Sequence, residues 1–189
     1  MKSKQTYLLA LLSAFLLWAA WPPMRFTTPL LLVALVPLFI ALESISLSGA
    51  KKNGKHIFLT AGLTFLVWNT GSIYWVYNAI SAYNGTLVAL PVSLIPYGLG
   101  AFLMTSAFWL FYRLSKYSNK KVAYLGLVAF YIAFEYLQQT WDLAFPWMTL
   151  GNGLAGMHQL AQWYDYTGVY GGSLWILVSN IFAFEAYRK

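Results

Sequence analysis

The stretch EYLQQTWDLAFPWMTLGNG, residues 135–153, decides how the rest of this sequence is interpreted. Glu135 stands near the end of an apolar run, and the residues that follow include two tryptophans, one proline and two glycines. Connections in soluble proteins run over a wet surface, whereas tryptophan favours the headgroup level of a lipid bilayer. The stretch therefore predicts a connection that lies at a membrane interface, with a carboxylate close to it.

The composition of the whole chain supports a lipid environment. Of the 189 residues 60% are hydrophobic and 9% are charged, whereas ordinary soluble domains have about 25% charged residues. A soluble core of this size cannot hide so much apolar surface, so we expect an all-α membrane protein. Because no linker or low-complexity stretch divides the chain, a single transmembrane helical domain is expected over residues 1–189.

Six apolar runs have lengths close to the roughly 20 residues that a spanning helix needs. They predict a bundle of about six transmembrane helices, at residues 7–21, 29–47, 57–79, 86–112, 122–138 and 169–187. The first run is short. The fourth is long and contains Pro91 and Pro96, which predict a kinked or late-starting helix there.

The basic residues predict an orientation. In a six-helix topology eleven of the twelve lysines and arginines fall on one side, and only Arg25 falls on the other. Since positively charged connections stay in the cytoplasm, both termini are expected to be cytoplasmic and residues 139–168 to lie outside. A cleaved signal peptide is the alternative interpretation of the N-terminus, because Lys2 and Lys4 precede an apolar run.

Several classes of function find no support in the sequence. The net charge of +7 is distributed in short clusters between apolar runs, so no nucleic acid is expected as a partner. The chain has no cysteine, which excludes disulfides, thiolate metal sites and a cysteine nucleophile. Neither a metal site nor a cofactor is predicted, because no ligand spacing or phosphate-binding loop occurs.

Glu135 is the first candidate for a functional residue. A charged side chain within the bilayer is costly, and such residues usually face a bundle interior or a wet cavity. Glu135 is expected either to contact a polar substrate group or handle a proton, or to reach the outer interface or bond to a neighbouring helix.

Aromatic residues supply the other candidates. Phe145, Pro146 and Trp147 lie in the external connection, which forms either an anchoring belt at the headgroups or a platform that receives lipid. Pro146 prevents a regular helix there, so the connection is expected to dip back or lie along the surface. Trp75 and Tyr77 end the third run, and they either serve packing or line the same outer cavity as Glu135.

Together these segments resemble a known protein family. The motif FPWMTLGNG (145–153), with Glu135 before it and GVYGG (168–172) after it, is similar to apolipoprotein N-acyltransferase. The hairpin AFLLWAAWPPMRFTTPLLLVALVPL (14–38) resembles that family's first two helices. The segment IYWVYNAI (73–80) resembles its third helix, so the resemblance extends over essentially the whole chain.

The resemblance implies a multi-pass protein of the bacterial inner (cytoplasmic) membrane and an acyl transfer from phospholipid to the N-terminal amine of a lipoprotein. In the family this reaction uses a thioester on a cysteine, within a Glu-Lys-Cys triad of a nitrilase-type periplasmic domain. No catalytic residue carries over, because this sequence has no cysteine and no length for that domain. The lipid-facing residues that the resemblance implies are Trp75, Tyr77, Glu135, Phe145, Pro146 and Trp147.

The expected function is therefore that of the membrane-embedded N-terminal part of an apolipoprotein N-acyltransferase, as a fragment or as half of a split enzyme. Alone it is expected to be inactive. The expected partners are membrane phospholipid, lipoprotein acyl chains and a separate nitrilase-like catalytic chain. A small transporter with Glu135 as its coupling carboxylate, a lipid-binding scaffold and a structural membrane subunit stay open as alternatives.

Overall fold

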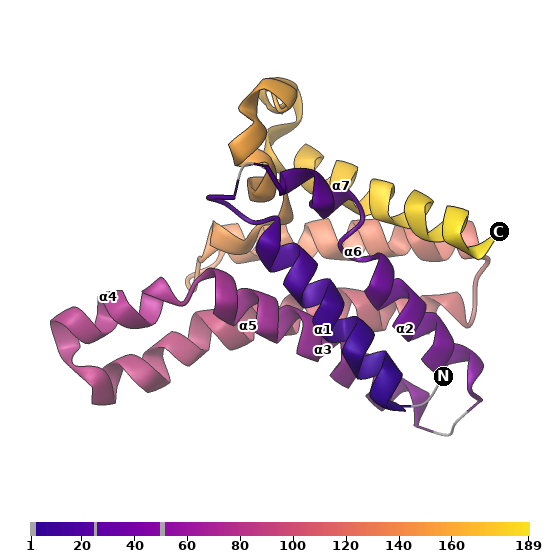
Figure 1. Cartoon of the computed structure of the whole chain (residues 1–189), viewed down its shortest axis with the longest axis horizontal. Coiled ribbons are helices and arrows are strands. Elements are labelled where there is room, and N and C mark those ends of the chain that lie inside the picture. The colour runs from indigo at the N-terminus through magenta and orange to yellow at the C-terminus, as the bar shows by residue number, and fades with distance from the viewer. Residues whose placement is uncertain (1–2, 25, 50–51) are drawn as a thin grey trace.

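The computed structural model describes residues 3–24, 26–49 and 52–189, and all regular structure within these ranges is helical (Figure 1). The elements are α1 (Ser3–Ala19), η1 (Thr28–Leu32), α2 (Val36–Leu47), α3 (Asn53–Ser72), α4 (Trp75–Asn84), α5 (Thr86–Ser115), α6 (Lys120–Thr140), η2 (Pro146–Met148), η3 (Leu150–Leu160) and α7 (Tyr164–Arg188), where η denotes a 3₁₀ helix. The predicted all-α class is confirmed for the described residues.

Three helical segments of the described chain are long and apolar enough to cross a membrane: Thr28–Leu47, Thr86–Ser115 and Tyr164–Arg188. Helices α3 and α4 meet the same criterion together, but they are bent by 55°. Helix α1 is apolar but has only 17 residues. These segments support a helical membrane protein, while the count of six spans and the cytoplasmic position of both ends stay predictions.

The third and fourth helices differ from the sequence prediction. The run at 57–79 was expected to be one helix, but α3 ends at Ser72 and the chain bends before α4, which continues to Asn84. Gly85 reverses the chain with a φ of +79°, a conformation that suits glycine. Helix α5 then begins at once, at Thr86, as the run 86–112 predicted, and contains both Pro91 and Pro96. Of the two alternatives for this helix, kinked or late-starting, the late start is wrong.

Helices α4 and α5 are joined by packing and by one side chain. The two helices lie side by side and form the hairpin that projects from the bundle at the left of Figure 1. The Tyr97 hydroxyl of α5 donates to the Tyr74 carbonyl oxygen and accepts the Tyr77 N–H, both at 3.2 Å. A side chain of α5 therefore bonds the backbone at the break between α3 and α4.

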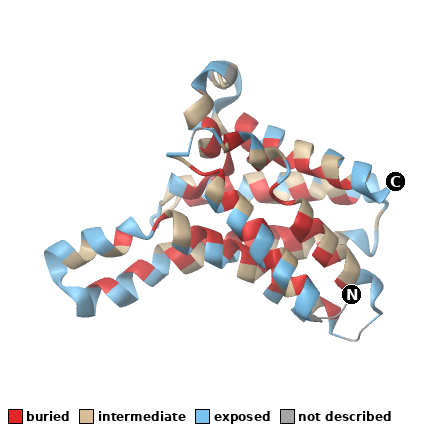
Figure 2. Ribbon diagram, in the orientation of Figure 1, coloured by how far each residue is buried: buried red, intermediate tan, exposed pale blue. Residues whose placement is uncertain are grey.

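Helix α3 lies in the centre of the bundle and packs against α1, α2 and α5 (Figure 1). Aromatic rings fill the space between them: the centroids of Phe65 and Phe108 are 5.2 Å apart, and those of Phe39 and Phe108 are 5.6 Å apart. Many apolar side chains stay exposed, particularly on the projecting hairpin (Figure 2). Exposed apolar surface of this extent is typical of a protein whose solvent is lipid.

A buried asparagine joins α7 to the junction between η1 and α2. The Asn180 side chain of α7 donates to the Leu31 carbonyl oxygen at 2.7 Å and to the Ile176 carbonyl oxygen at 2.8 Å. Its Oδ1 atom accepts the Leu35 N–H at 2.7 Å. These bonds satisfy backbone groups where the chain leaves η1 and enters α2, so α7 is fixed against that junction.

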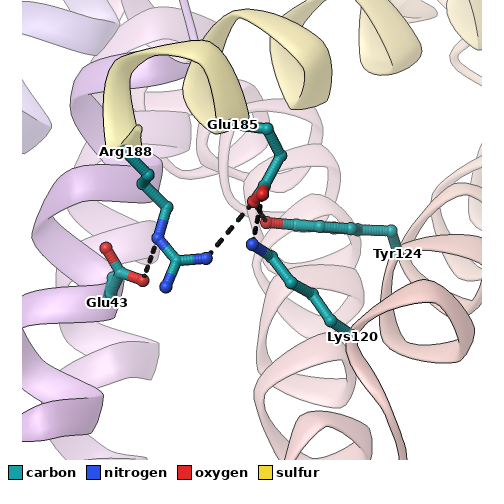
Figure 3. Close-up of polar contacts among 5 residues, drawn as sticks. All are labelled: Glu43, Lys120, Tyr124, Glu185 and Arg188. Carbon is teal, nitrogen blue, oxygen red and sulfur yellow. Dashed lines mark hydrogen bonds and ion pairs between the residues drawn. The ribbon is translucent and has the colours of Figure 1, made fainter.

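Charged side chains connect three helices at one end of the bundle (Figure 3). Glu185 of α7 pairs with Lys120 of α6, and its Oε1 accepts the Tyr124 hydroxyl at 2.5 Å. Arg188 reaches Glu43 of α2, with 2.7 Å between Nε and Oε1. The start of α6 and the ends of α2 and α7 therefore share one end of the molecule.

The start of α3 and the end of α5 belong to that same end, because Gly54 lies against the rings of Trp109 and Tyr112. The described basic residues Lys52 and Lys116 therefore lie at the same end of the bundle as Lys120 and Arg188. Three basic residues of the predicted pattern, namely Lys2, Arg25 and Lys51, lie outside the described residues.

Candidate functional site

The site develops around Glu135, which lies in the last part of α6 and is only 2% exposed. Its Oε1 atom accepts the backbone N–H of Leu150 at 2.6 Å. The other oxygen, Oε2, is buried without a hydrogen bond of ordinary geometry, and the Ser173 hydroxyl lies close to the carboxylate. The side chain therefore points inward, beneath the connection that follows α6, and holds the first residue of η3.

Side chains and backbone groups of α6 fix the connection at two further points. The Gln139 Nε2 atom donates to the Thr149 hydroxyl at 3.1 Å, and that hydroxyl donates to the Pro146 carbonyl oxygen at 3.0 Å. The Phe145 N–H donates to the Gln138 carbonyl oxygen at 3.1 Å. Pro146 begins the short helix η2, which agrees with the prediction that no regular α-helix forms there.

Glycines let the connection approach α7 closely. A Cβ atom added to Gly151 would lie 2.0 Å from the Val169 carbonyl oxygen, and one added to Gly172 would lie 2.9 Å from the Cα atom of Gly151. The Gly151 N–H donates to the Ser173 hydroxyl at 2.9 Å, and the Gly151 carbonyl oxygen accepts the Tyr164 hydroxyl at 2.7 Å. The connection is therefore packed onto the bundle, as the sequence predicted.

The exposed part of the site is aromatic. The rings of Trp75 and Trp147 meet edge to face with centroids 5.5 Å apart, although they come from α4 and η2. Trp75 is 41% exposed and Trp147 is 58% exposed, and Pro146 beside it is also exposed. Half-exposed tryptophan pairs of this kind suit the headgroup region of a bilayer.

The six residues expected to face lipid thus fall into two groups. Trp75, Pro146 and Trp147 are exposed, whereas Glu135 is buried beneath them in the connection's anchor. Tyr77 and Phe145 are half-buried and pack against the hydrophobic core. Trp75 and Trp147 are in contact. Glu135 bonds a backbone amide and does not line an outer cavity with them.

An apolar pocket of about 560 Å³ lies where η1, η3 and α7 meet. Its walls are Pro29 and Leu32 from η1, Leu154 and Met157 from η3, and the tryptophans Trp163 and Trp175. None of these side chains carries a charge. The pocket matches the hydrocarbon of a lipid, because burial of apolar chains in such walls is favourable and nonspecific.

Comparison with known proteins identifies the chain's relatives. The family model for the apolipoprotein N-acyltransferase N-terminal domain matches residues 13–182 of this sequence. The chain belongs to this family. The apolipoprotein N-acyltransferase of Chlorobaculum tepidum is 27% identical over 177 residues, which is 93% of this chain and 30% of that protein. No solved structure gives a significant match.

Two other apolipoprotein N-acyltransferases agree. That of Geobacter metallireducens is 25% identical over 98% of this chain and 34% of its own length. That of Borreliella burgdorferi is 27% identical over 73% of this chain and 24% of its own length. The sequence therefore spans about a third or less of the relatives' length, and it matches the family's N-terminal domain. Family membership confirms the resemblance on which the acyltransferase hypothesis rests.

Sequence reasoning missed most of the residues that build the anchor in this apolipoprotein N-acyltransferase domain. Neither Gly151 nor Ser173 was among the candidate residues. The motifs TLGNG and GVYGG were the available signal, since paired small residues permit close approach of two backbones. Among the described residues no cluster of three or more metal-ligating side chains occurs.

Proposed function

We propose that this chain is the membrane-embedded platform of an apolipoprotein N-acyltransferase, and that the connection 139–163 is its lipid-receiving surface. The observation that carries the proposal is the exposed Trp75–Trp147 pair, held by a connection that Glu135 and Gly151 fix to the bundle. A rigid aromatic surface of this kind offers contact area at a low cost in conformational entropy.

The chemistry assigned to the platform is binding and orientation. The acyl chain of a phospholipid or lipoprotein enters the apolar pocket beside η3, and its headgroup stays at the level of the two tryptophans. Holding the chain in one place brings its ester or amine end within reach of a catalytic group, which is how positioning lowers a barrier.

The acyl-carrying thiol comes from elsewhere in this proposal. The 189 residues contain no cysteine, so a thioester cannot form on them. The nitrilase-type Glu-Lys-Cys domain therefore acts from residues beyond this sequence or from a separate chain, and the platform alone transfers no acyl group. The second arrangement predicts that a nitrilase-like chain co-purifies with this one.

We place the platform in the inner membrane as a multi-pass protein, with both ends in the cytoplasm. The support is the shared end at which Lys120, Arg188 and the starts and ends of several helices meet, since basic ends stay on the cytoplasmic side (Figure 3). The aromatic connection then belongs to the periplasmic side, where lipoprotein acylation is expected.

The experiment reconstitutes the chain in vesicles that contain a phospholipid with a photoreactive group on its acyl chain. After irradiation we expect labelled peptides from residues 139–163, and a several-fold lower yield in the double variant Trp75→Ala, Trp147→Ala. The matched control is Tyr117→Ala, which removes an exposed aromatic residue at the basic end. Equal labelling of all three proteins contradicts the proposal.

A second measurement tests whether this chain alone transfers an acyl group. The reconstituted chain is incubated with phospholipid that carries a radioactive acyl group and with a diacylglyceryl lipopeptide. We expect no radioactivity on the chain or on the peptide amine. Transfer to either one by the purified chain alone contradicts the proposed dependence on an external thiol.

A further inference from the structure

A second groove lies at the basic end of the bundle, between the start of α3 and the end of α5. It has a volume of about 790 Å³ and is open to the surroundings of the protein along the two helices. Lys52 and Lys55 come from the α3 side, and Arg113 and Lys116 come from the α5 side. All four cationic side chains are exposed.

These four cations have no acidic partner within the described chain. The chain has only five acidic residues. Glu43 and Glu185 pair with Arg188 and Lys120, and Glu135 is bonded beneath the connection after α6. The remaining two, Asp142 and Asp165, lie at the opposite ends of α6 and α7. No carboxylate of the described residues is therefore paired with these four cations, and the groove attracts anions.

Aromatic rings hold two of the cations at the groove. The guanidinium carbon of Arg113 lies 5.3 Å from the centroid of the Trp109 ring, and the Lys116 Nζ atom lies 4.5 Å from that of Tyr112. Such cation–π contacts restrict long basic side chains to a few positions. The positive charge is thus directed to one place between α3 and α5.

The deeper part of the groove is apolar. Phe58 of α3 and Phe102 of α5 meet with ring centroids 6.1 Å apart, and Leu59 beside them is 46% exposed. Phe102 lies eleven residues before Arg113, which corresponds to about 16 Å along a helix. The groove therefore offers cations at its outer end and a hydrocarbon surface toward the middle of the bundle.

We propose that this groove binds one anionic phospholipid, with its phosphate among Lys52, Lys55, Arg113 and Lys116 and an acyl chain along Phe58, Leu59 and Phe102. A soluble anion uses only the cations, and a neutral lipid uses only the apolar wall, so an anionic amphiphile matches both parts. Basic pockets between membrane helices bind anionic headgroups in this manner. The site is distinct from the aromatic surface at the other end of the bundle.

The test is native mass spectrometry of the purified chain in detergent, titrated with dioctanoyl phosphatidylglycerol and, separately, with dioctanoyl phosphatidylcholine. We expect at least tenfold tighter binding of phosphatidylglycerol. The double variants Arg113→Gln, Lys116→Gln and Lys52→Gln, Lys55→Gln are each expected to weaken it by about 25-fold, since each basic residue contributes about fivefold. All four changes are at exposed positions, so circular dichroism should report an unchanged fold.

The charge-matched control is Lys4→Gln, Lys121→Gln, which removes two exposed cations that do not line the groove. It should change the affinity less than threefold, and an equal loss in this control overturns the proposal in favour of diffuse attraction. The variant Ser106→Trp fills the apolar wall without a change in charge and should also weaken binding. An unchanged affinity in Ser106→Trp, or equal binding of glycerol 3-phosphate, overturns the lipid assignment.

Discussion

The Oε1 atom of Glu135 accepts the backbone N–H of Leu150 at 2.6 Å, fifteen residues further along the chain. This single bond joins the end of α6 to the start of η3, and both groups are buried. An amide in such a place has no water to replace a lost partner, so its acceptor matters for the position of the whole connection. The carboxylate is thus an anchor for the aromatic surface.

Replacement of Glu135 by alanine should release this connection. The Leu150 N–H is then left unpaired in a buried place, which costs about 1–3 kcal/mol of unfolding free energy. Thermal unfolding in detergent measures the loss, and hydrogen exchange at the Leu150 amide should accelerate. Glu135→Gln keeps an acceptor oxygen and serves as the control, with most of the stability retained. If the alanine variant is as stable as the parent chain, the anchor role is wrong.

Gly151→Ala should destabilise the protein for a steric reason. The new Cβ atom would lie 2.0 Å from the Val169 carbonyl oxygen, a backbone atom that cannot move without α7. Overpacking of this kind costs about 1–3 kcal/mol. Gly98→Ala is the matched control, because no atom lies within 4 Å of its Cβ position inside α5. Alanine there should leave the unfolding temperature unchanged or raise it.

Asn180→Ala should loosen the junction of η1 and α2 from α7. The substitution leaves the Leu35 N–H and the Leu31 carbonyl oxygen without their buried partner. The expected loss is about 1–3 kcal/mol for each unpaired group, measured by thermal unfolding in detergent. Asn78→Ala removes an exposed asparagine of α4 and should change stability by less than about 0.5 kcal/mol. Equal effects of the two substitutions would contradict the bridging role.

The all-helical class, the approximate positions of several helices and the family could be predicted from the sequence because they depend on local patterns. The lengths of the apolar runs and the motif FPWMTLGNG can be read from the sequence without knowledge of the tertiary structure. The bend between α3 and α4 was missed, although Gly71 and Ser72 directly precede it and helices often kink at such a pair. Contacts with another helix, such as the two bonds of the Tyr97 hydroxyl, hold the chain at the bend.

Only part of the site could be predicted from the sequence, for a similar reason. Trp75 and Trp147 could be chosen as interfacial residues by type, but their contact depends on the path of η2. The partner of Glu135 is the backbone N–H of Leu150. Nearly every residue has such a group, so the residue type at position 150 gives no sign of the contact. The cationic groove likewise combines two clusters, Lys52–Lys55 and Arg113–Lys116, that only the packing of α3 on α5 brings together.

The proposed orientation can be measured directly, because the chain has no cysteine of its own. Cysteine is introduced at Tyr166, which follows the aromatic connection and is 92% exposed, or at Tyr117, which is 80% exposed at the basic end. In intact cells with a permeabilised outer membrane, a membrane-impermeant maleimide should label Tyr166→Cys and leave Tyr117→Cys unlabelled until the inner membrane is opened. The physical reason is that the basic connections resist translocation. Labelling of Tyr117→Cys in intact cells would invert the topology, and with it the assignment of the aromatic surface to the periplasmic side.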